Sequence, residues 1–573
     1  MSPAVGRLAA LRSERLGLLT LSVLIGAGAG LGAVAFRYMI EGFTLVLSGH
    51  RDYSAAGHAA NPHASFLGPY FVVLAPVVAG LLYGPLVYRF AREARGHGVP
   101  EVMLAVARNG GRIRPQVAVV KSLASALCIG GGGSVGREGP IVQIGSALGS
   151  TLAQTFGLGE RKVKLLVSCG AAGGIAATFN APLAGVFFAM ELILREWATE
   201  SFGMVVVSSV TASVISRSIL GDSPFLKLPT FHIEHTVQYP LFAVLGVLAG
   251  LIGVGFSRAL YAIEDLCDWA WRGPEWARPA VGGVLLGLLL LVLPQMYGVG
   301  YPVLGKAVDG GYGIAFLIAL LVGKILACSL TIGIGGSGGV FAPSLFCGAM
   351  AGAVFGDVVH AIAPHSGGSV GAYALIGMGA VFAGAARAPI SAVLILFELT
   401  GEYTIILPLM LAIVLAAGAS HLVSKDTVYT RKLIRRGIDI DEPADAIVRR
   451  RPTSQFMTAP PTPIDADKSV AAAAEMFIAS GEAHLPVVTA DGFLGVISSH
   501  DVMHALAAGE ETDVRALTER CTPVTPDTPL GEVLQRIEHD AGAVPVADAD
   551  GTITGWVRQR DLLAALRPAA RLP

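Results

Sequence analysis

The chain has 573 residues, of which 53% are hydrophobic and only 14% are charged, and its mean hydropathy is +0.63. Soluble proteins carry about 25% charged residues, so this composition excludes an ordinary soluble domain and indicates an integral membrane protein. The net charge of −1 gives no general attraction to nucleic acid, and we expect no nucleic-acid partner.

Apolar runs mark the candidate membrane helices. Arg7, Arg12 and Arg15 precede the first run without a cleavage site, which predicts a retained helix and a cytoplasmic N-terminus. Runs 181–190 and 389–397 are too short to cross a bilayer alone, and the whole chain contains 72 glycines. Both observations favour broken or re-entrant helices over a simple helix bundle. The longer runs lie near 16–36, 69–88, 240–256, 281–295, 315–330 and 404–419.

Residues 130–140 read GGGGSVGREGP and are the most informative segment of the chain. Glycines let backbone N–H groups face a ligand, and Pro140 suits the first turn of a helix. The segment therefore predicts a helix start whose free amides and positive dipole hold an anion. Glu138 lies inside that start, so its carboxylate and a dissolved anion would compete for one place.

The membrane part repeats itself internally. Residues 180–192 (NAPLAGVFFAMEL) align without a gap to residues 387–399 (RAPISAVLILFEL), and GREGP at 136–140 aligns to GVFAP at 339–343. Such repeats are typical of transporters, which place broken helix ends from two halves around a midplane site. We assign residues 1–445 to this membrane domain, with halves of about 16–220 and 238–424.

The composition becomes basic and polar after residue 425, and a duplicated soluble α/β part follows. Each copy reads as a helix, a strand, a tight Asp-Gly turn, a second strand and a helix, with the leading helices at 468–480 and 529–539. We assign residues 446–512 to the first module and 513–573 to the second.

The motifs GHGVP at 96–100, GREGP, NAPLAG, GGVFAP and RAPIS and the late Tyr429 stand in the order of the CLC chloride channel and transporter family, which the chain resembles. The C-terminal part resembles a pair of CBS domains. The resemblance implies a polytopic α-helical membrane protein with an inverted repeat and discontinuous helices, plus a cytoplasmic α/β CBS pair. It also implies a homodimer in a bacterial inner membrane, with chloride as the default small anion and no enzymatic activity.

The resemblance also assigns roles to single residues. Glu138 would be the gating and proton-accepting glutamate, and Lys121 would raise the positive potential along the pathway, although a lysine snorkelling to the membrane interface is the alternative. His97 replaces the usual serine, and here the alternative is a ring turned away and satisfied by the backbone. The anion-binding positions would be His97, Gly98, Arg137, Gly139, Val340, Phe341 and Tyr429.

Leu192 stands where proton-coupled members carry an inward-facing glutamate. This substitution favours a voltage- or pH-gated anion channel, and a chloride/proton antiporter with a non-standard proton route is the alternative. Glu191 and Glu398 match each other in the repeat and are interpreted as structural. Glu196 and Glu200 are interpreted as solvated charges rather than as substitute proton carriers.

The remaining hypotheses concern ligands and other protein classes. Ser498, Asp501 and Asp561 match the CBS pattern that holds an adenine nucleotide, and the alternative is a dimerisation scaffold. We expect no cofactor for transport, no metal site and no disulfide among the six scattered cysteines. A serine-type intramembrane protease using Ser337 and His421 is disfavoured because Ser337 lies in an anion-binding turn, and a zinc-type protease is disfavoured because the H-E-x-x-H motif is absent. A magnesium transporter is disfavoured because it would need acidic residues inside its membrane spans, and the pathway motifs present amides and arginine instead.

Overall fold

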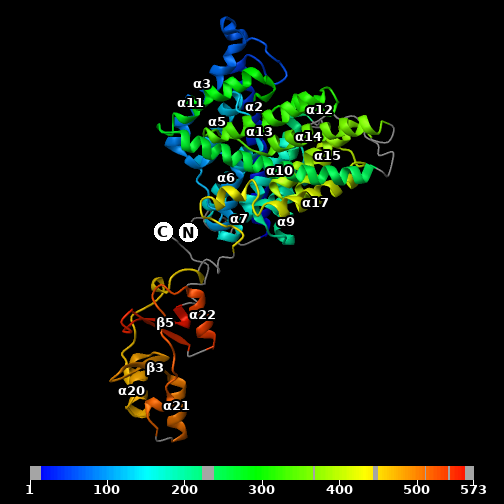
Figure 1. The fold of residues 1–573 in the computed structure, drawn as a ribbon. Helices are drawn as coiled ribbons and strands as arrows, with labels where there is room; N and C mark the ends of the chain where they lie inside the picture. Colours follow the sequence, from blue (N-terminus) through cyan, green and yellow to red (C-terminus); the bar gives the residue numbers. More distant parts are fainter. Residues whose placement is uncertain are drawn as a thin grey trace. The chain divides into compact units, whose positions relative to one another are not determined.

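The computed structural model describes residues 15–221, 238–364, 368–442, 449–509, 512–539 and 542–561. They form two compact units, residues 1–440 and 441–573, of which the first is helical and the second mixes helices and strands (Figure 1). Arg7, Arg12 and the predicted domain boundary at 445/446 lie outside the described residues, so the predicted domain limits stay predictions.

The first unit is built from two series of helices that correspond to the two halves of the repeat. The first series is α2 (Arg15–Ser48), α3 (Phe71–Phe90), α4 (Val99–Arg108), α5 (Gln116–Gly130), α6 (Glu138–Thr155), α7 (Glu160–Phe179), α8 (Pro182–Phe188) and α9 (Thr199–Leu220). The second series is α10 (Gln238–Ala270), α11 (Arg278–Val292), α12 (Tyr301–Val308), α13 (Ile314–Gly333), α14 (Phe341–Ile362), α15 (Val370–Ala386), α16 (Pro389–Thr400), α17 (Ile406–Val423) and α18 (Thr430–Ile434).

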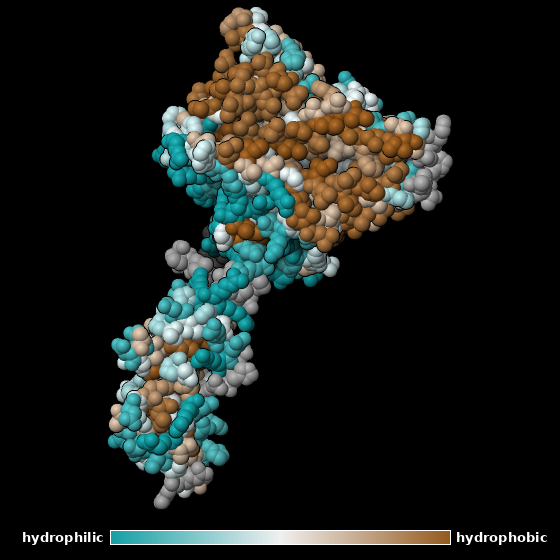
Figure 2. Space-filling model, in the orientation of Figure 1, coloured by the Kyte–Doolittle hydropathy of each residue, from teal (hydrophilic) through white to brown (hydrophobic). Residues whose placement is uncertain are grey.

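Eight helices of the described chain are long and apolar enough to cross a membrane. Three of them, α7, α9 and α14, are not among the apolar runs predicted from the sequence, because glycine, alanine and serine lower their mean hydropathy. In α7 the most apolar window is 83% buried against other helices, so this helix needs little lipid-facing surface. Elsewhere the unit presents a broad apolar surface (Figure 2). The exposed large apolar side chains of this unit include Leu82, Leu285 and Leu407.

Close helix crossings repeat in the two halves and confirm the internal duplication. A Cβ on Gly145 of α6 would meet the carbonyl oxygen of Gly170 of α7, and a Cβ on Gly348 of α14 would meet that of Gly377 of α15. Only glycine lets these backbones touch, as in other tightly packed membrane helices. The two short helices that follow the proline motifs, α8 and α16, are too short to span a membrane, as the sequence predicts.

The second unit contains the two predicted modules, each with one helix before its strand pair. The first holds β1 (Ile464–Asp465), α20 (Val470–Ser480), β2 (His484–Thr489), β3 (Gly492–Ser498) and α21 (Ser499–Ala508), and the second holds α22 (Leu530–His539), β4 (Ala543–Ala547) and β5 (Ile553–Arg558). The modules are interleaved, because Thr458 pairs with Trp556 of β5 while Glu519 pairs with Val496 of β3. Each module thus completes the sheet of the other.

Candidate functional site

Three glycine-rich loops meet in the interior of the first unit. The backbone N–H of Gly96 donates to Gly336 O at 3.0 Å. Gly136 and Gly339 exchange two backbone hydrogen bonds, at 2.7 and 2.6 Å. Bridges of this kind between the first and second halves of the chain fix the GHGVP, GREGP and GGVFAP motifs against one another.

Each of these motifs opens a helix. Gly98 is the N-cap of α4 with a left-handed backbone (φ 84°), Arg137 is the N-cap of α6, and Val340 is the N-cap of α14. Tyr429 is the N-cap of the short α18. Helix N-termini present unpaired backbone N–H groups and positive dipole ends, the arrangement that binds anions.

Glu138 is the first residue of α6, and it is only 1% exposed. Its Oε1 accepts a hydrogen bond of 2.5 Å from the hydroxyl of Tyr301, the first residue of α12. Sequence reasoning missed Tyr301, because it belongs to no glycine-rich motif and comes from the other half of the repeat. Only the Gly300-Tyr301-Pro302 helix start offered a weak local signal.

His97 is buried, and neither ring nitrogen has a hydrogen-bond partner in the part of the chain that the structure describes. The alternative of a ring satisfied by the backbone is therefore wrong. The ring centroid lies 6.0 Å from that of Tyr261, whose hydroxyl donates to Val428 O at 2.7 Å. Tyr261 thereby links the first motif to the segment that carries the buried Tyr429.

Lys121 is fully buried, so the alternative of interfacial snorkelling is wrong. Its Nζ donates to Ala94 O at 2.9 Å and to Gly96 O at 2.7 Å, and so holds the loop that enters the GHGVP motif. Lys324 precedes Pro343 by as many residues as Lys121 precedes Pro140, and it is equally buried. Lys324 donates to Ser134 Oγ at 2.9 Å and to Gly298 O and Val299 O at 3.1 and 3.0 Å.

The carboxylates near Leu192 are engaged elsewhere. Glu191 and Glu398 accept backbone hydrogen bonds at helix starts, which supports their structural interpretation. Glu196 pairs with Arg161 and Glu200 with Arg15, and their side chains are 46% and 52% exposed. Both are solvated charges, as the sequence predicts.

A cavity of about 680 Å³, here called the vestibule, lies beside the site. Arg137 and Tyr301 line it, so it adjoins the N-terminus of α6 and the carboxylate of Glu138. Its charged lining consists of Arg37, Glu41, Arg51, Asp52 and Arg137.

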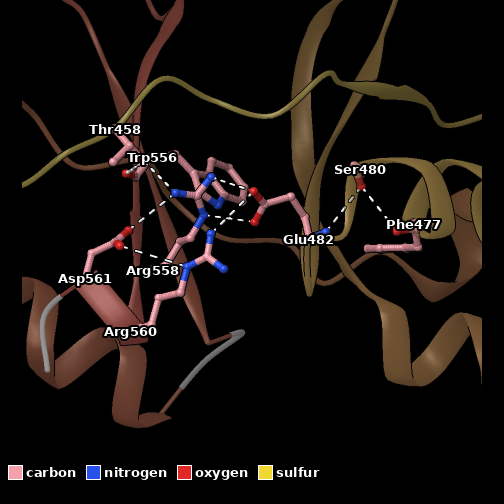
Figure 3. Close-up of polar contacts among 8 residues, drawn as sticks. All are labelled: Thr458, Phe477, Ser480, Glu482, Trp556, Arg558, Arg560 and Asp561. Carbon is pink, nitrogen blue, oxygen red and sulfur yellow. Dashed lines mark hydrogen bonds and ion pairs between the residues drawn. The ribbon is translucent and has the colours of Figure 1, made fainter. Parts of the chain in front are cut away.

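The two CBS-like positions of the second unit differ. Ser498 caps α21 and donates to Asp501 Oδ2 at 2.8 Å, and Asp501 borders a cavity of about 300 Å³. At the matching end of β5, Arg558 makes two hydrogen bonds to Glu482, at 2.9 and 2.7 Å, and lies 3.5 Å from Asp561 (Figure 3). The second position is therefore filled by a bulky ion pair between modules.

Other classes of site find no support among these residues. Within the described ranges, no group of three or more His, Cys, Asp or Glu side chains is placed to hold a metal ion. Ser337 Oγ lies 2.8 Å from Ser125 Oγ and donates to Ala94 O at 2.7 Å, so it closes the loop cluster and does not face a histidine base.

The model of the family described as "Voltage gated chloride channel" matches residues 79–421, and the CBS domain model matches residues 454–508 and 513–568. A "Putative chloride channel protein ClcB-like" of Ralstonia nicotianae is 32% identical over 74% of this chain and 98% of its own. The "H(+)/Cl(-) exchange transporter ClcA" of Vibrio cholerae is 34% identical over 73% of this chain and 89% of its own. The crystal structure of a slow cyanobacterial Cl⁻/H⁺ antiporter, 25% identical, covers 74% of this chain and 98% of its own with a TM-score of 0.66.

Proposed function

The chain belongs to the voltage gated chloride channel family and carries a CBS domain pair, and from this premise we propose that it exchanges chloride for protons across a membrane. Anion transport is the activity of the family. The exchange transporter of Vibrio cholerae and the cyanobacterial antiporter support exchange over the gated channel that Leu192 favours in the sequence. Leu192 then means that protons take another internal route.

One observation carries the proposal: the carboxylate of Glu138 is buried at the N-terminus of α6, where the loops of both halves meet. The amides that attract an anion there also attract this carboxylate. Chloride and the carboxylate therefore compete for this anion site, and a protonated Glu138 would vacate it for chloride. The competition couples one proton-binding event to anion movement.

The proposed pathway includes further anion contacts. The backbone N–H groups of Arg137, Gly139, Val340 and Phe341 lie at or beside the starts of α6 and α14. Gly98 opens α4, and the His97 ring and the Tyr429 hydroxyl would complete the donors. Lys121, buried beneath the first motif, adds positive potential, and burying chloride without such donors would cost several kcal/mol.

We further propose a homodimer in a bacterial inner membrane, with the N-terminus and the CBS pair in the cytoplasm. The cavity beside Asp501 is the candidate site for an adenine nucleotide, and transport itself requires no cofactor. A dimerisation scaffold is the competing role for the CBS pair.

The experiment is a measurement of zero-current voltage on liposomes that contain the purified full chain. A chloride gradient is applied first alone and then with a pH gradient. Exchange predicts that the pH gradient shifts the voltage away from the chloride equilibrium value, and that Glu138→Gln abolishes this shift. A wild-type voltage that stays at the chloride value would return the protein to the channel hypothesis.

A further inference from the structure

The Tyr301 hydroxyl contacts the buried carboxylate of Glu138 from the opposite half of the membrane unit. It donates to Oε1 at 2.5 Å, and it stands at the first position of α12, directly after Gly300 with its left-handed backbone (φ 87°). We propose that Tyr301 is a latch that holds the ionised Glu138 in the anion pathway and so sets the rate and the pH dependence of transport. The proposal rests on the gating role of Glu138 given above.

The structure fixes Tyr301 before any gating movement. Lys324 of α13 donates to the carbonyl oxygens of Gly298 and Val299, three and two residues before Tyr301, at 3.1 and 3.0 Å. At the start of the same segment, the hydroxyl of Tyr297 donates to Gly130 O at 2.7 Å. Because this segment is tied to α13 and to the end of α5, the phenol of Tyr301 is preorganised, and little freedom is lost when it binds the carboxylate.

The chemistry of the contact distinguishes the two protonation states of Glu138. A phenol O–H donates most strongly to an ionised carboxylate, so the contact stabilises the charged, blocking form over the protonated form that leaves the pathway. The guanidinium carbon of Arg137 lies 5.3 Å from the centroid of the Tyr301 ring and supports the same state. Lys324 and Tyr429 are the other titratable groups near this carboxylate in the described structure.

Tyr301 also lines the vestibule, so this cavity offers space into which the Glu138 carboxylate can move when it leaves Tyr301. A carboxylate that moves away from α6 toward this cavity breaks the hydrogen bond to Tyr301. Every movement of Glu138 out of the pathway therefore costs the energy of this hydrogen bond. Tyr312, beyond the end of α12, packs against Phe316 and Lys306 and so serves as a control tyrosine in the same region.

The test is Tyr301→Phe in the full chain, with chloride and proton fluxes measured from liposomes between pH 4.5 and 7.5. Removing the donor makes Glu138 easier to protonate and release. We expect a rise of about 3- to 10-fold in chloride turnover and a shift of the half-maximal pH by about one unit to the alkaline side, as the loss of a hydrogen bond to a charged group predicts. Tyr312→Phe should change neither quantity. Unaltered turnover and pH profile in Tyr301→Phe would overturn the proposal.

A second pair of variants separates a latch from a packing role. In Glu138→Ala there is no carboxylate to hold, so adding Tyr301→Phe should leave turnover and its pH profile as they are in Glu138→Ala. An equal change in both backgrounds would show that Tyr301 acts through packing alone. If wild-type protein moves chloride without protons, the exchange proposal fails, while the chloride flux of these variants still decides the role of Tyr301.

Discussion

Glu191 and Glu398 cap each other's repeat. Glu191, beyond the end of α8, accepts from the backbone N–H groups of Ile390 and Ser391 at the start of α16, at 3.2 and 2.8 Å. Glu398, near the end of α16, accepts from the N–H groups of Leu183 and Ala184 at the start of α8, at 3.0 and 2.7 Å. Each helix end meets the other helix's beginning, so α8 and α16 run antiparallel, as an inverted repeat requires.

These caps predict that Glu191 and Glu398 matter for stability and not for proton transfer. Glu191→Ala or Glu398→Ala leaves two amides of a helix start unsatisfied and should lower the free energy of unfolding by about 1–2 kcal/mol. Proton coupling should persist in both. Thermal unfolding in detergent and the liposome voltage measure the two effects, with Glu200→Ala as an exposed control. Lost coupling in the folded Glu191→Ala protein would make Glu191 a proton carrier instead.

The glycine crossings give a second prediction. In Gly170→Ala and Gly377→Ala the new methyl group meets a backbone carbonyl of the neighbouring helix, which cannot move away as a side chain would. We expect each to destabilise the protein by about 1–3 kcal/mol or more and to lower its unfolding temperature. Gly203 of α9 has open space at the same point, so Gly203→Ala should be neutral or stabilising. Equal effects of all three would contradict the close crossing.

The sequence alone predicted the parts of the site that have a local signature. The glycines and prolines of GHGVP, GREGP and GGVFAP mark helix starts, and the aligned NAPLAG and RAPIS segments reveal the repeat. The hydrogen bond of Tyr301 to Glu138 and the interleaving of Thr458 with Trp556 could not be predicted, because they join segments far apart in the chain. The helices α7 and α14 are underestimated because hydropathy reports contact with lipid, whereas these glycine-rich helices pack largely against protein. In α9, which is only 39% buried, serines lower the hydropathy instead.

The ring nitrogens of His97, which have no hydrogen-bond partner among the described residues, predict an effect on anion binding. An imidazole ring carries at least one N–H donor in either protonation state, so His97 can donate to an anion. His97→Ala removes this donor and should weaken chloride binding by about 3- to 10-fold, in line with one hydrogen bond to a charged partner. His97→Ser keeps a donor and should retain most of the affinity. Calorimetric titration with chloride checks both, and an unchanged affinity in His97→Ala would show that the ring does not face the anion.

His484, the first residue of β2, predicts a pH-dependent stability of the second unit. Burial lowers its pKa below the ordinary value near 6.5, against the opposing charge of Asp501. The unfolded chain therefore binds a proton more readily than the folded unit, and the stability that His484 contributes is full above about pH 6.5 and is lost as the pH falls below it. Hydrogen exchange of β2 and β3 in the full chain, corrected for the intrinsic rate, should rise between pH 7.5 and 5.5.

The variant His484→Gln should lose that increase in exchange, whereas His500→Gln, at an exposed position of α21, should keep it. The same pH dependence in wild-type and His484→Gln protein would assign the effect to another group.

The Glu482–Arg558 pair predicts that the two CBS modules are coupled energetically. Both side chains are less than one-fifth exposed and meet in a two-pronged contact, at 2.9 and 2.7 Å, which Thr458 Oγ1 extends at 2.9 Å (Figure 3). Glu482→Gln removes the negative partner between the modules and should cost about 1–3 kcal/mol, because a largely buried guanidinium loses the nearer of its two counter-charges and keeps only Asp561 at 3.5 Å. Arg558→Gln should cost a similar amount for the same reason.

In the double variant Glu482→Gln/Arg558→Gln neither member of the pair faces a lone charge of the other, so it should cost less than the sum of the two single changes. Chemical unfolding of the full chain, followed by hydrogen exchange of β5, gives the coupling energy. Arg515→Gln is the control, since both side chains of its ion pair with Asp467 are more than half exposed. Additive effects of Glu482→Gln and Arg558→Gln would mean that the contact contributes no net coupling, and that the interleaved strands alone hold the modules together.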